Sequence, residues 1–314
     1  MLRYGVPYKG SKNQIAEWVC SHFPKASNFY DLFAGGCAIT QIALMKQNFN
    51  RYFANDIDFD GILLFMNAIY GKYQNESRWV SREDFIVLKN KDPYIKYCWS
   101  FGNNGRDYLY SKEIEPYKKA VHFAVMFLDL SLISKCFPEA DFNFLKTYKD
   151  IYSRKIYLQR YLKKYSIAKH TIFESQVEDM CISQNLNRLE GLESLHRLQS
   201  LQSLQSLQLS NCSYENVKID KDSVVYLDPP YFDTNPYGDD KSNNFDYEKF
   251  YKWALQQKEL VIISEYNMPD DFICIDAIEK SVLLNSGASK KTLEKLFIPR
   301  KQAELYKKLL NKKR

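Results

Sequence analysis

Apolar and polar positions follow two different periods over the first seventy residues of the chain. Segments 14–23, 39–46 and 61–70 carry apolar residues at helical spacing. Between them, 28–33 and 51–56 are short runs of aromatic and aliphatic residues that predict strands. The first strand leads into two adjacent glycines, and the second ends in an aspartate. Strand, glycine turn, helix, strand and acid are typical of the first half of a nucleotide-binding α/β sheet.

This alternation breaks over residues 71–165, which are rich in Lys, Arg, Tyr and Asn and predict mostly helices. The exception is the segment 97–110, where Tyr97–Phe101 and Arg106–Tyr110 flank Gly102-Asn103-Asn104-Gly105. Asn-Gly between alternating aromatic residues favours a β-hairpin. Strand patterns return at 171–173, 224–227, 260–264, 272–275, 281–284 and 296–298. We therefore expect 71–165 to be a second domain inserted into a first domain made of 1–70 and 166–314.

Low complexity marks residues 185–211, in which leucine occurs at every third position from Leu189 to Leu207. A period of three drifts by about 60° per repeat on an α-helix, so the leucines spiral around it. This argues against a coiled coil, which needs one continuous apolar seam. We expect a surface helix or a linker, and we assign it no chemistry.

Length and composition set outer limits on the function. The 314 residues suffice for one large or two ordinary globular units, and 45% hydrophobic content supports a packed core. A net charge of +6 is compatible with a polyanionic partner without requiring one. Seven cysteines without a Cys-x-x-Cys pair and four scattered histidines argue against a metal site. No apolar stretch reaches 18 residues, so we expect a cytoplasmic protein that does not enter the membrane.

The segment with the most specific chemistry is Asp228-Pro229-Pro230-Tyr231, directly after the strand pattern 224–227. The Asp228 carboxylate can accept one N–H of a planar amine. The Pro229 carbonyl can accept the other, because two prolines cannot continue a strand or helix. Tyr231 offers a ring for stacking. Such a site suits transfer to an amino group without a strong base, and the alternative is a plain turn between strand and helix.

Three upstream motifs fit a nucleoside ligand. In Asp31-Leu32-Phe33-Ala34-Gly35-Gly36-Cys37 the paired glycines allow close approach, but the spacing differs from the dinucleotide fingerprint. Asp56 lies where an acid would bind ribose hydroxyls, or it caps a helix. Tyr8-Lys9-Gly10-Ser11-Lys12 places a lysine that could neutralise a ligand carboxylate, or it is a solvated basic terminus.

The order of these motifs resembles the Dam-type (D12 class) adenine-N6 DNA methyltransferases. Ser81–Phe85 and Asn285–Phe297 add to the similarity, which spans residues 8–298 without the leucine repeat. The resemblance implies a Rossmann-like S-adenosylmethionine-dependent sheet with an inserted, mostly helical target-recognition domain. One departure stands out: the family loop runs Phe-x-Gly-x-Gly, whereas this chain has Cys37 at the second glycine position. The Cβ and thiol of Cys37 could crowd the cofactor there, unless Gly36 takes over the close approach.

Site roles follow from the resemblance by position. Asp228, Pro229, Pro230 and Tyr231 would be catalytic, and no metal would be needed. S-adenosylmethionine would be bound by Tyr8, Lys12, Asp31, Phe33, Ala34, Gly35, Gly36, Cys37, Asp56 and Asp228. Ser175 and Gln176 fall where its adenine ring would be recognised. Double-stranded DNA would be contacted by Lys9, Asn103, Asn104, Arg106, Lys290 and Lys291, with the asparagines and the arginine at base edges and Lys290 and Lys291 at phosphates.

The implied reaction is methyl transfer to N6 of adenine in duplex DNA, after the base is flipped out of the stack. We expect a monomer, and a cognate restriction endonuclease is a candidate partner. Three alternatives stay open. An RNA adenine methyltransferase would share the pocket, and a glutamine-N5 protein methyltransferase typically has Asn at the position of Asp228. The third alternative is a catalytically silent DNA-binding homologue.

Overall fold

The computed structural model describes residues 4–168, 184–231, 245–283 and 289–311. Two compact units make up the chain. The first unit comprises residues 1–70 and 195–314, and the second comprises residues 71–194. The second unit starts at the predicted beginning of the insertion and extends past residue 165, because its last helix packs against an earlier helix of the same unit.

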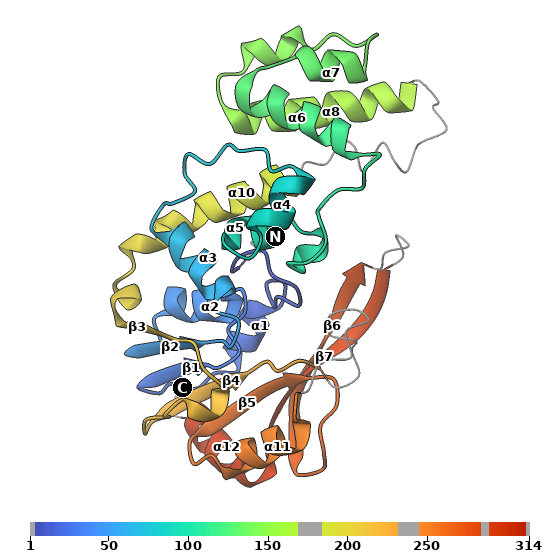
Figure 1. The fold of residues 1–314 in the computed structure, drawn as a ribbon. Coiled ribbons are helices and arrows are strands. Elements are labelled where there is room, and N and C mark those ends of the chain that lie inside the picture. Colours follow the sequence, from blue (N-terminus) through green and yellow to red (C-terminus); the bar gives the residue numbers. More distant parts are fainter. Residues whose placement is uncertain (1–3, 169–183, 232–244, 284–288, 312–314) are drawn as a thin grey trace. The chain divides into compact units, whose positions relative to one another are not determined.

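A seven-stranded sheet forms the centre of the first unit (Figure 1). Its strand order is β3-β2-β1-β4-β5-β7-β6. The strands are β1 (Asn28–Asp31), β2 (Arg51–Asn55), β3 (Leu207–Ser210), β4 (Ser223–Leu227), β5 (Leu260–Glu265), β6 (Phe272–Leu283) and β7 (Ser289–Pro299). The first five in this order are parallel, whereas β7 is antiparallel to both β5 and β6. The chain is therefore a mixed α/β protein with a mostly parallel sheet, consistent with a methyltransferase fold.

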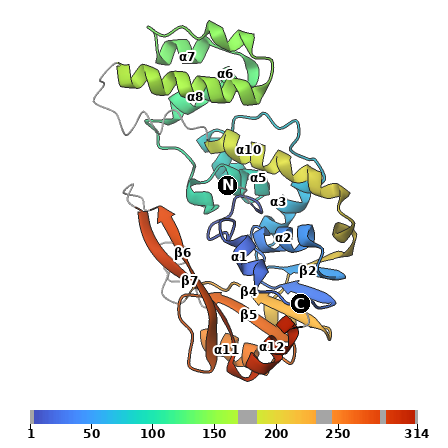
Figure 2. The same cartoon turned by 180° about the vertical axis from the view of Figure 1, so that it is seen from behind.

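Helices cover both faces of this sheet, as Figures 1 and 2 show. On one side lie α1 (Ala16–Ser21), α2 (Ala38–Lys46) and α3 (Asp60–Ile69), and on the other lies α11 (Tyr247–Gln256). The last helix, α12 (Ala303–Asn311), contacts the end of α1, because the Tyr306 hydroxyl donates a 3.2 Å hydrogen bond to the His22 carbonyl. β1, β4 and β5 are buried along their whole length, as expected of parallel strands covered twice. Phe250 and Ala254 of α11 pack against Val225, Val261 and other strand residues in the core.

Most of the predicted elements of the first unit are present, with a few differences in detail. The strand patterns 272–275 and 281–284 belong to one strand, β6, which has a register shift between Cys274 and Asp276. β6 and β7 together form a long hairpin. The predicted strand 171–173, with Ser175 and Gln176 after it, lies outside the described residues. Among the described residues, no helix has the length and apolar character needed to span a membrane.

The second unit is helical in its described part. Its helices are α4 (Arg82–Leu88), α5 (Pro93–Cys98), α6 (Glu115–Phe127), α7 (Ser131–Cys136), α8 (Ile151–Ala168) and α10 (Gln184–Ser194). α6, α7 and α8 lie side by side and bury Ala120, Val121, Leu158 and Leu162 with other apolar residues in a shared core (Figure 2).

The predicted hairpin over 97–110 is wrong in most of its length. Tyr97 and Cys98 end helix α5 instead, because Asp92 caps the Tyr94 backbone N–H and Pro93 starts the helix. Strand pairing is limited to one antiparallel bridge between Ser100 and Tyr108. The helical capping signal just before this segment overrides the alternation of aromatic residues within it.

The leucine repeat also differs from the prediction, because its helices change type. After α10 the chain forms two 3-10 helices, η3 (Leu195–Ser200) and η4 (Gln202–Ser206), and then the unpredicted strand β3. A 3-10 helix has three residues per turn, so a period of three brings each leucine back to the same face. Leu195 and Leu198 are each only 2% exposed, and η3 packs against α3. The repeat is therefore part of the core rather than a surface linker.

Shortening a buried leucine of η3 should destabilise the first unit measurably. We expect Leu198→Ala to lower the free energy of unfolding by about 2 to 4 kcal/mol, because it leaves a cavity in the core. The neighbouring exposed Gln199→Ala is the control and should change it by less than about 0.5 kcal/mol. Urea denaturation measures both, and equal effects would contradict a buried repeat.

Candidate active site

The predicted site residues follow three adjacent parallel strands at the edge where those strands end. β1 ends at Asp31, Asp56 follows β2, and Asp228 follows β4. β1 pairs with β2 on one side and with β4 on the other, so the direction in which the chain adds strands reverses at β1 (Figure 1). Ligands of open α/β sheets bind at the carboxyl ends of the strands at such a reversal. The structure thus brings the three carboxylates to one edge of the sheet.

A buried lysine connects the Asp228 segment to the N-terminal loop. Lys12 Nζ donates a 2.7 Å hydrogen bond to Asp228 Oδ1 and lies 3.6 Å from Glu294 Oε1 of β7. The same ammonium lies 4.6 Å from the centroid of the Tyr231 ring. The Tyr231 hydroxyl donates to Glu294 Oε1, and the Tyr266 ring meets the Tyr231 ring edge-on at 4.7 Å. Four segments distant in sequence therefore meet around one cation.

Charge compensation keeps Lys12 protonated. Burial by itself lowers the pKa of Lys12, but the carboxylates of Asp228 and Glu294 outweigh that effect, so the pKa lies above its ordinary value. Burial raises the pKa of Tyr231 well above its ordinary value, which keeps the phenol neutral. The predicted role of Lys12, neutralising a ligand carboxylate, conflicts with this arrangement because two protein carboxylates already balance its charge.

Asp31 is a buried carboxylate with one oxygen unsatisfied. Thr40 Oγ1 donates a 2.7 Å hydrogen bond to Asp31 Oδ2, whereas Asp31 Oδ1 has no hydrogen-bond partner in the described structure. Burial raises the pKa of Asp31 to about 7, since desolvation penalises the charged form. An unsatisfied buried carboxylate oxygen is costly unless a ligand donates to it. Asp31 therefore marks a place for a cationic or N–H donor group.

Asp56 holds the glycine turn in place. Its Oδ2 accepts a 2.7 Å hydrogen bond from the Gly35 backbone N–H, and its Oδ1 accepts one of 2.8 Å from Asp58 N–H. Burial raises the pKa of Asp56 to about 6. The alternative interpretation as a cap of α3 does not hold, because the N-cap position is Phe59. A carboxylate has about four acceptor positions, so Asp56 retains capacity for a ligand hydroxyl.

Close backbone contacts explain the glycines around this turn. A Cβ on Gly36 would lie 2.7 Å from Tyr8 Cβ, and a Cβ on Gly61 of α3 would lie 2.2 Å from the Gly35 carbonyl oxygen. Val6 N–H also donates a 2.8 Å hydrogen bond to the Gly36 carbonyl. The N-terminal loop, the glycine turn and α3 thus approach one another more closely than side-chain-bearing residues allow.

Cys37, the departure from the family loop, occupies the position at which glycine would be favoured. Its φ of 58° is left-handed, and it is the N-cap residue of α2. The residue is fully buried at 0% exposure, and burial raises the pKa of its thiol well above the ordinary value. The Cys37 side chain thus packs inside the protein, and its expected effect on the cofactor stays a prediction.

Glu294, Thr40 and Tyr266 belong to this site but were missed in the sequence. A signal for Glu294 was present, since it alternates with Leu296 and Ile298 along β7 and all three are buried. A charged residue at an inward-facing strand position needs a partner, and here the partners are Lys12 and Tyr231. Nothing in the sequence distinguished Thr40 or Tyr266 from ordinary helix and loop residues.

The predicted DNA-contacting residues lie on separate elements of both units. The Asn104 side chain stabilises its own loop, because its oxygen accepts hydrogen bonds from the Arg106 and Asp107 backbone N–H groups. Asn103 has a left-handed φ of 56°, and its side-chain oxygen is buried. The Arg106 side chain is exposed. Lys9, the residue after Tyr8 in the sequence, is partly buried.

Lys290 and Lys291 pair with Val282 and Ser281 of β6 in the β6–β7 hairpin.

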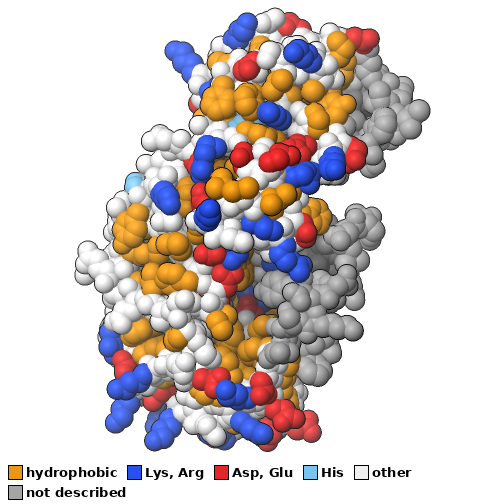
Figure 3. Space-filling view, viewed as in Figure 1, with side chains coloured by type: hydrophobic (Ala, Val, Ile, Leu, Met, Phe, Trp, Pro, Cys, Tyr) orange, Lys and Arg blue, Asp and Glu red, His pale blue; other side chains and the backbone are white. Residues whose placement is uncertain are grey.

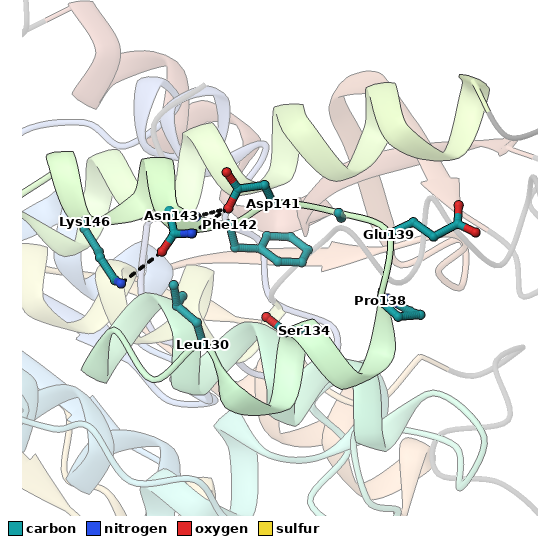
Figure 4. A pocket seen from close by; sticks show the side chains of 9 residues that line it. Leu130, Ser134, Pro138, Glu139, Asp141, Phe142, Asn143 and Lys146 are labelled. Carbon is teal, nitrogen blue, oxygen red and sulfur yellow. Dashed lines mark hydrogen bonds between the residues drawn. The ribbon is translucent and has the colours of Figure 1, made fainter.

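A cavity of about 470 Å³ in the second unit has no catalytic character (Figure 4). It lies between α7 and η2 (Asn143–Thr147). Its polar side chains bond one another, since Asn143 donates to Asp141 and accepts from Lys146. Within the described parts of the chain, no group of three His, Cys, Asp or Glu side chains is placed to hold a metal ion.

Two helical glycines provide a matched test of the close contact. Gly61→Ala should destabilise the protein by about 1 to 3 kcal/mol, because the new Cβ meets the Gly35 backbone. Gly191→Ala in α10 has open space around it and should stabilise by about 0.5 to 1 kcal/mol. Thermal denaturation measures both, and a neutral Gly61→Ala variant would show that the glycine is not needed for packing.

The comparison with known families agrees with this geometry. A search of curated proteins finds no match to the chain. The model of the D12 class N6 adenine-specific DNA methyltransferases matches residues 8–261, which include the glycine turn and the Asp228–Tyr231 segment. Because this match spans most of the sequence, the resemblance is confirmed and the chain belongs to the D12 class of N6 adenine-specific DNA methyltransferases.

Proposed function

We propose that this protein transfers the methyl group of S-adenosylmethionine to N6 of adenine within a defined site in duplex DNA, with the target base flipped out of the stack. The observation that carries the proposal is the meeting of Asp31, Asp56 and the Asp228–Tyr231 segment at one edge of the sheet in a chain of this family. The remaining expectations accompany this proposal: a monomer, a cytoplasmic location, which rests on the sequence composition, and a cognate restriction endonuclease, which rests on the family.

The residues at the sheet edge fit the charge of S-adenosylmethionine. The unsatisfied Asp31 Oδ1 suits the ammonium of its methionine end, and Asp56 retains acceptor positions for ribose hydroxyls. Asp228 and Glu294 add two carboxylates against the single cation of Lys12. This excess of negative charge favours a cationic ligand over an anionic one. The turn from Phe33 to Cys37 would then enclose the methionine end.

Asp228 and Pro229 would hold the target amine. When bound, S-adenosylmethionine supplies a methyl group already activated by its sulfonium. The protein needs to align the amine, which an Asp228 oxygen and the Pro229 carbonyl can do by accepting its two N–H groups. The Tyr231 ring would stack on the base, and the hydroxyl contact with Glu294 fixes that ring. Glu294 is in this view a positioning residue.

Lys12 has a role different from the predicted one in this proposal. Its ammonium holds Asp228 Oδ1 by a 2.7 Å hydrogen bond, and Asp228 Oδ2 is the second acceptor of this carboxylate. The 3.6 Å separation from Glu294 offers the ammonium a second carboxylate when an amine competes for Asp228 Oδ1. Lys12 would thus orient Asp228. When the substrate amine binds Asp228 Oδ1, the Lys12 ammonium would pair with Glu294, so no buried charge would be left unpaired.

The second compact unit, residues 71–194, is our candidate for target recognition. Arg106 is the best placed of the predicted base readers, because its side chain is exposed and arginine pairs well with guanine. Asn104 is a weaker candidate, since its side-chain oxygen already binds two backbone N–H groups. The family match disfavours the glutamine methyltransferase alternative. The methyl-transfer assay below tests the other two alternatives, an RNA adenine methyltransferase and a catalytically silent DNA-binding homologue.

Removing the Asp228 carboxylate should abolish methyl transfer. We expect Asp228→Ala to lower the rate at least about a hundredfold, because the amine loses an acceptor that aligns it. The exposed Asp271→Ala is the matched control and should keep full activity. Tritiated methyl incorporation into duplex DNA, single-stranded DNA and RNA measures the outcome. Wild-type transfer to RNA alone, or no transfer at all, would refute the proposed function.

Binding of the cofactor product should depend on pH through Asp31. The pKa of about 7 in the free protein falls when an ammonium group binds beside it, so binding favours the ionised form. The affinity for S-adenosylhomocysteine should therefore rise about tenfold as pH increases from about 5.5 to about 7.5. Asp56, with a pKa of about 6, adds to this trend at its acidic end.

Asp31→Asn should flatten most of this pH profile in isothermal titration calorimetry. Asp56→Asn should flatten only its more acidic part, because Asp56 has the lower pKa. An unchanged profile in Asp31→Asn would show that the carboxylate does not face the ligand.

A further inference from the structure

We infer that the exposed face of α8 in the second unit binds the phosphate backbone of the DNA substrate. This inference rests on the proposed function and adds a contact surface that the predicted base-reading residues do not include. It is carried by the distribution of charge along the chain, by the spacing of side chains on α8 and by the contacts that fix this helix.

The whole positive excess of the protein resides in one short segment. Residues 143–168, which form η2 and α8, contain seven Lys and Arg residues and one acid, Asp150, a net charge of +6. The complete chain has 44 Lys and Arg against 38 Asp and Glu, also +6. The other residues therefore carry 37 of each sign and are neutral overall. On the face that Figure 3 shows, blue and red side chains are interspersed over each unit.

Helical spacing places Arg160 and Lys164 of α8 on its outward face. Tyr157, Arg160 and Lys164 follow one another at intervals of three and four residues, so they lie along one stripe, and all three are exposed. Leu158 and Leu162 point the other way, into the core shared with α6. A stripe of cations beside aromatic rings is typical of surfaces that bind nucleic acids.

Contacts within the second unit hold this surface rigid. Lys155 forms an ion pair with Glu190 of α10, which ties α8 to its neighbour. The Tyr148 and Tyr157 rings stack at 4.2 Å with their planes 12° apart. The Arg160 guanidinium lies 5.7 Å from the centroid of the Tyr157 ring. Because the rings and the arginine are already ordered, binding a polyanion costs little side-chain entropy.

Three exposed cations in and next to α8 lack acidic partners within the described part of the chain. No ion pair is present there for Lys149, Arg160 or Lys164, all of which are exposed. Asp150 is occupied at the start of α8, where it accepts a 2.7 Å hydrogen bond from the Ser153 backbone N–H. Duplex DNA carries one negative charge per about 1.7 Å of its axis and releases counterions when such cations bind. The surface should therefore contribute affinity without sequence preference.

The test compares two triple variants of the full-length protein. The α8 variant, Lys149→Ala/Arg160→Ala/Lys164→Ala, removes one exposed cation just before α8 and two on its outward face. The control, Lys258→Ala/Lys301→Ala/Lys308→Ala, removes three exposed lysines of the first unit. Binding to a specific and a random duplex is measured by fluorescence anisotropy across a salt titration. We expect the α8 variant to bind both duplexes at least about tenfold more weakly. Its slope of log affinity against log salt should be smaller by about 2 to 3.

Methylation separates this inference from the proposed function. In the α8 variant KM for DNA should rise while kcat at saturating duplex stays at the wild-type value, and the control triple should match wild type throughout. An unchanged salt slope with intact methylation would overturn the α8 surface and leave the proposed function standing. A protein that shows the α8 salt effect but transfers no methyl group would refute the proposed function instead. Equal or tighter binding of RNA, or of vesicles with anionic lipid, would also overturn duplex DNA as the occupant.

Discussion

The ammonium of Lys12 is the constraint on which the site depends. It is the cation around which Asp228, Glu294 and Tyr231 converge, and burial of those carboxylates would be unfavourable without it. The interaction joins the N-terminal loop to the end of β4 and to β7, which are far apart in sequence. One buried charge thereby fixes the relative positions of three segments of the same unit.

Backbone proximity is the second requirement of this unit. The glycine turn can accept Tyr8 above it and α3 beside it only because Gly36 and Gly61 lack side chains. Asp56 then holds the turn through the Gly35 N–H. Close packing of this kind fixes the positions of the carboxylates before a ligand binds. Asp31 Oδ1, which has no hydrogen-bond partner, is then the acceptor available to a ligand.

The two units have opposite electrostatic characters. Carboxylates dominate the sheet edge of the first unit, where Asp31 and Asp56 have raised pKa values because burial disfavours their charge. Cations dominate α8 of the second unit, and Arg160 and Lys164 are exposed there. A cationic small molecule and a polyanion are the ligands that suit these two environments, and both are what an S-adenosylmethionine-dependent DNA methyltransferase requires.

The sequence by itself determined the parallel strands, the glycine turn and the acids that end the strands, because these depend on local periodicity and on residues close in the chain. Tertiary structure alone decided the partner of Lys12, which lies 216 residues away, and the part played by Glu294. It also gave the leucine repeat 3-10 geometry, which buries its leucines against α3. Tyr97 and Cys98 end a helix for a local reason, the capping by Asp92 and Pro93 just before them. Local pattern fixes which element a segment favours, whereas pairing of buried charges and helix type depend on neighbours that only the folded chain supplies.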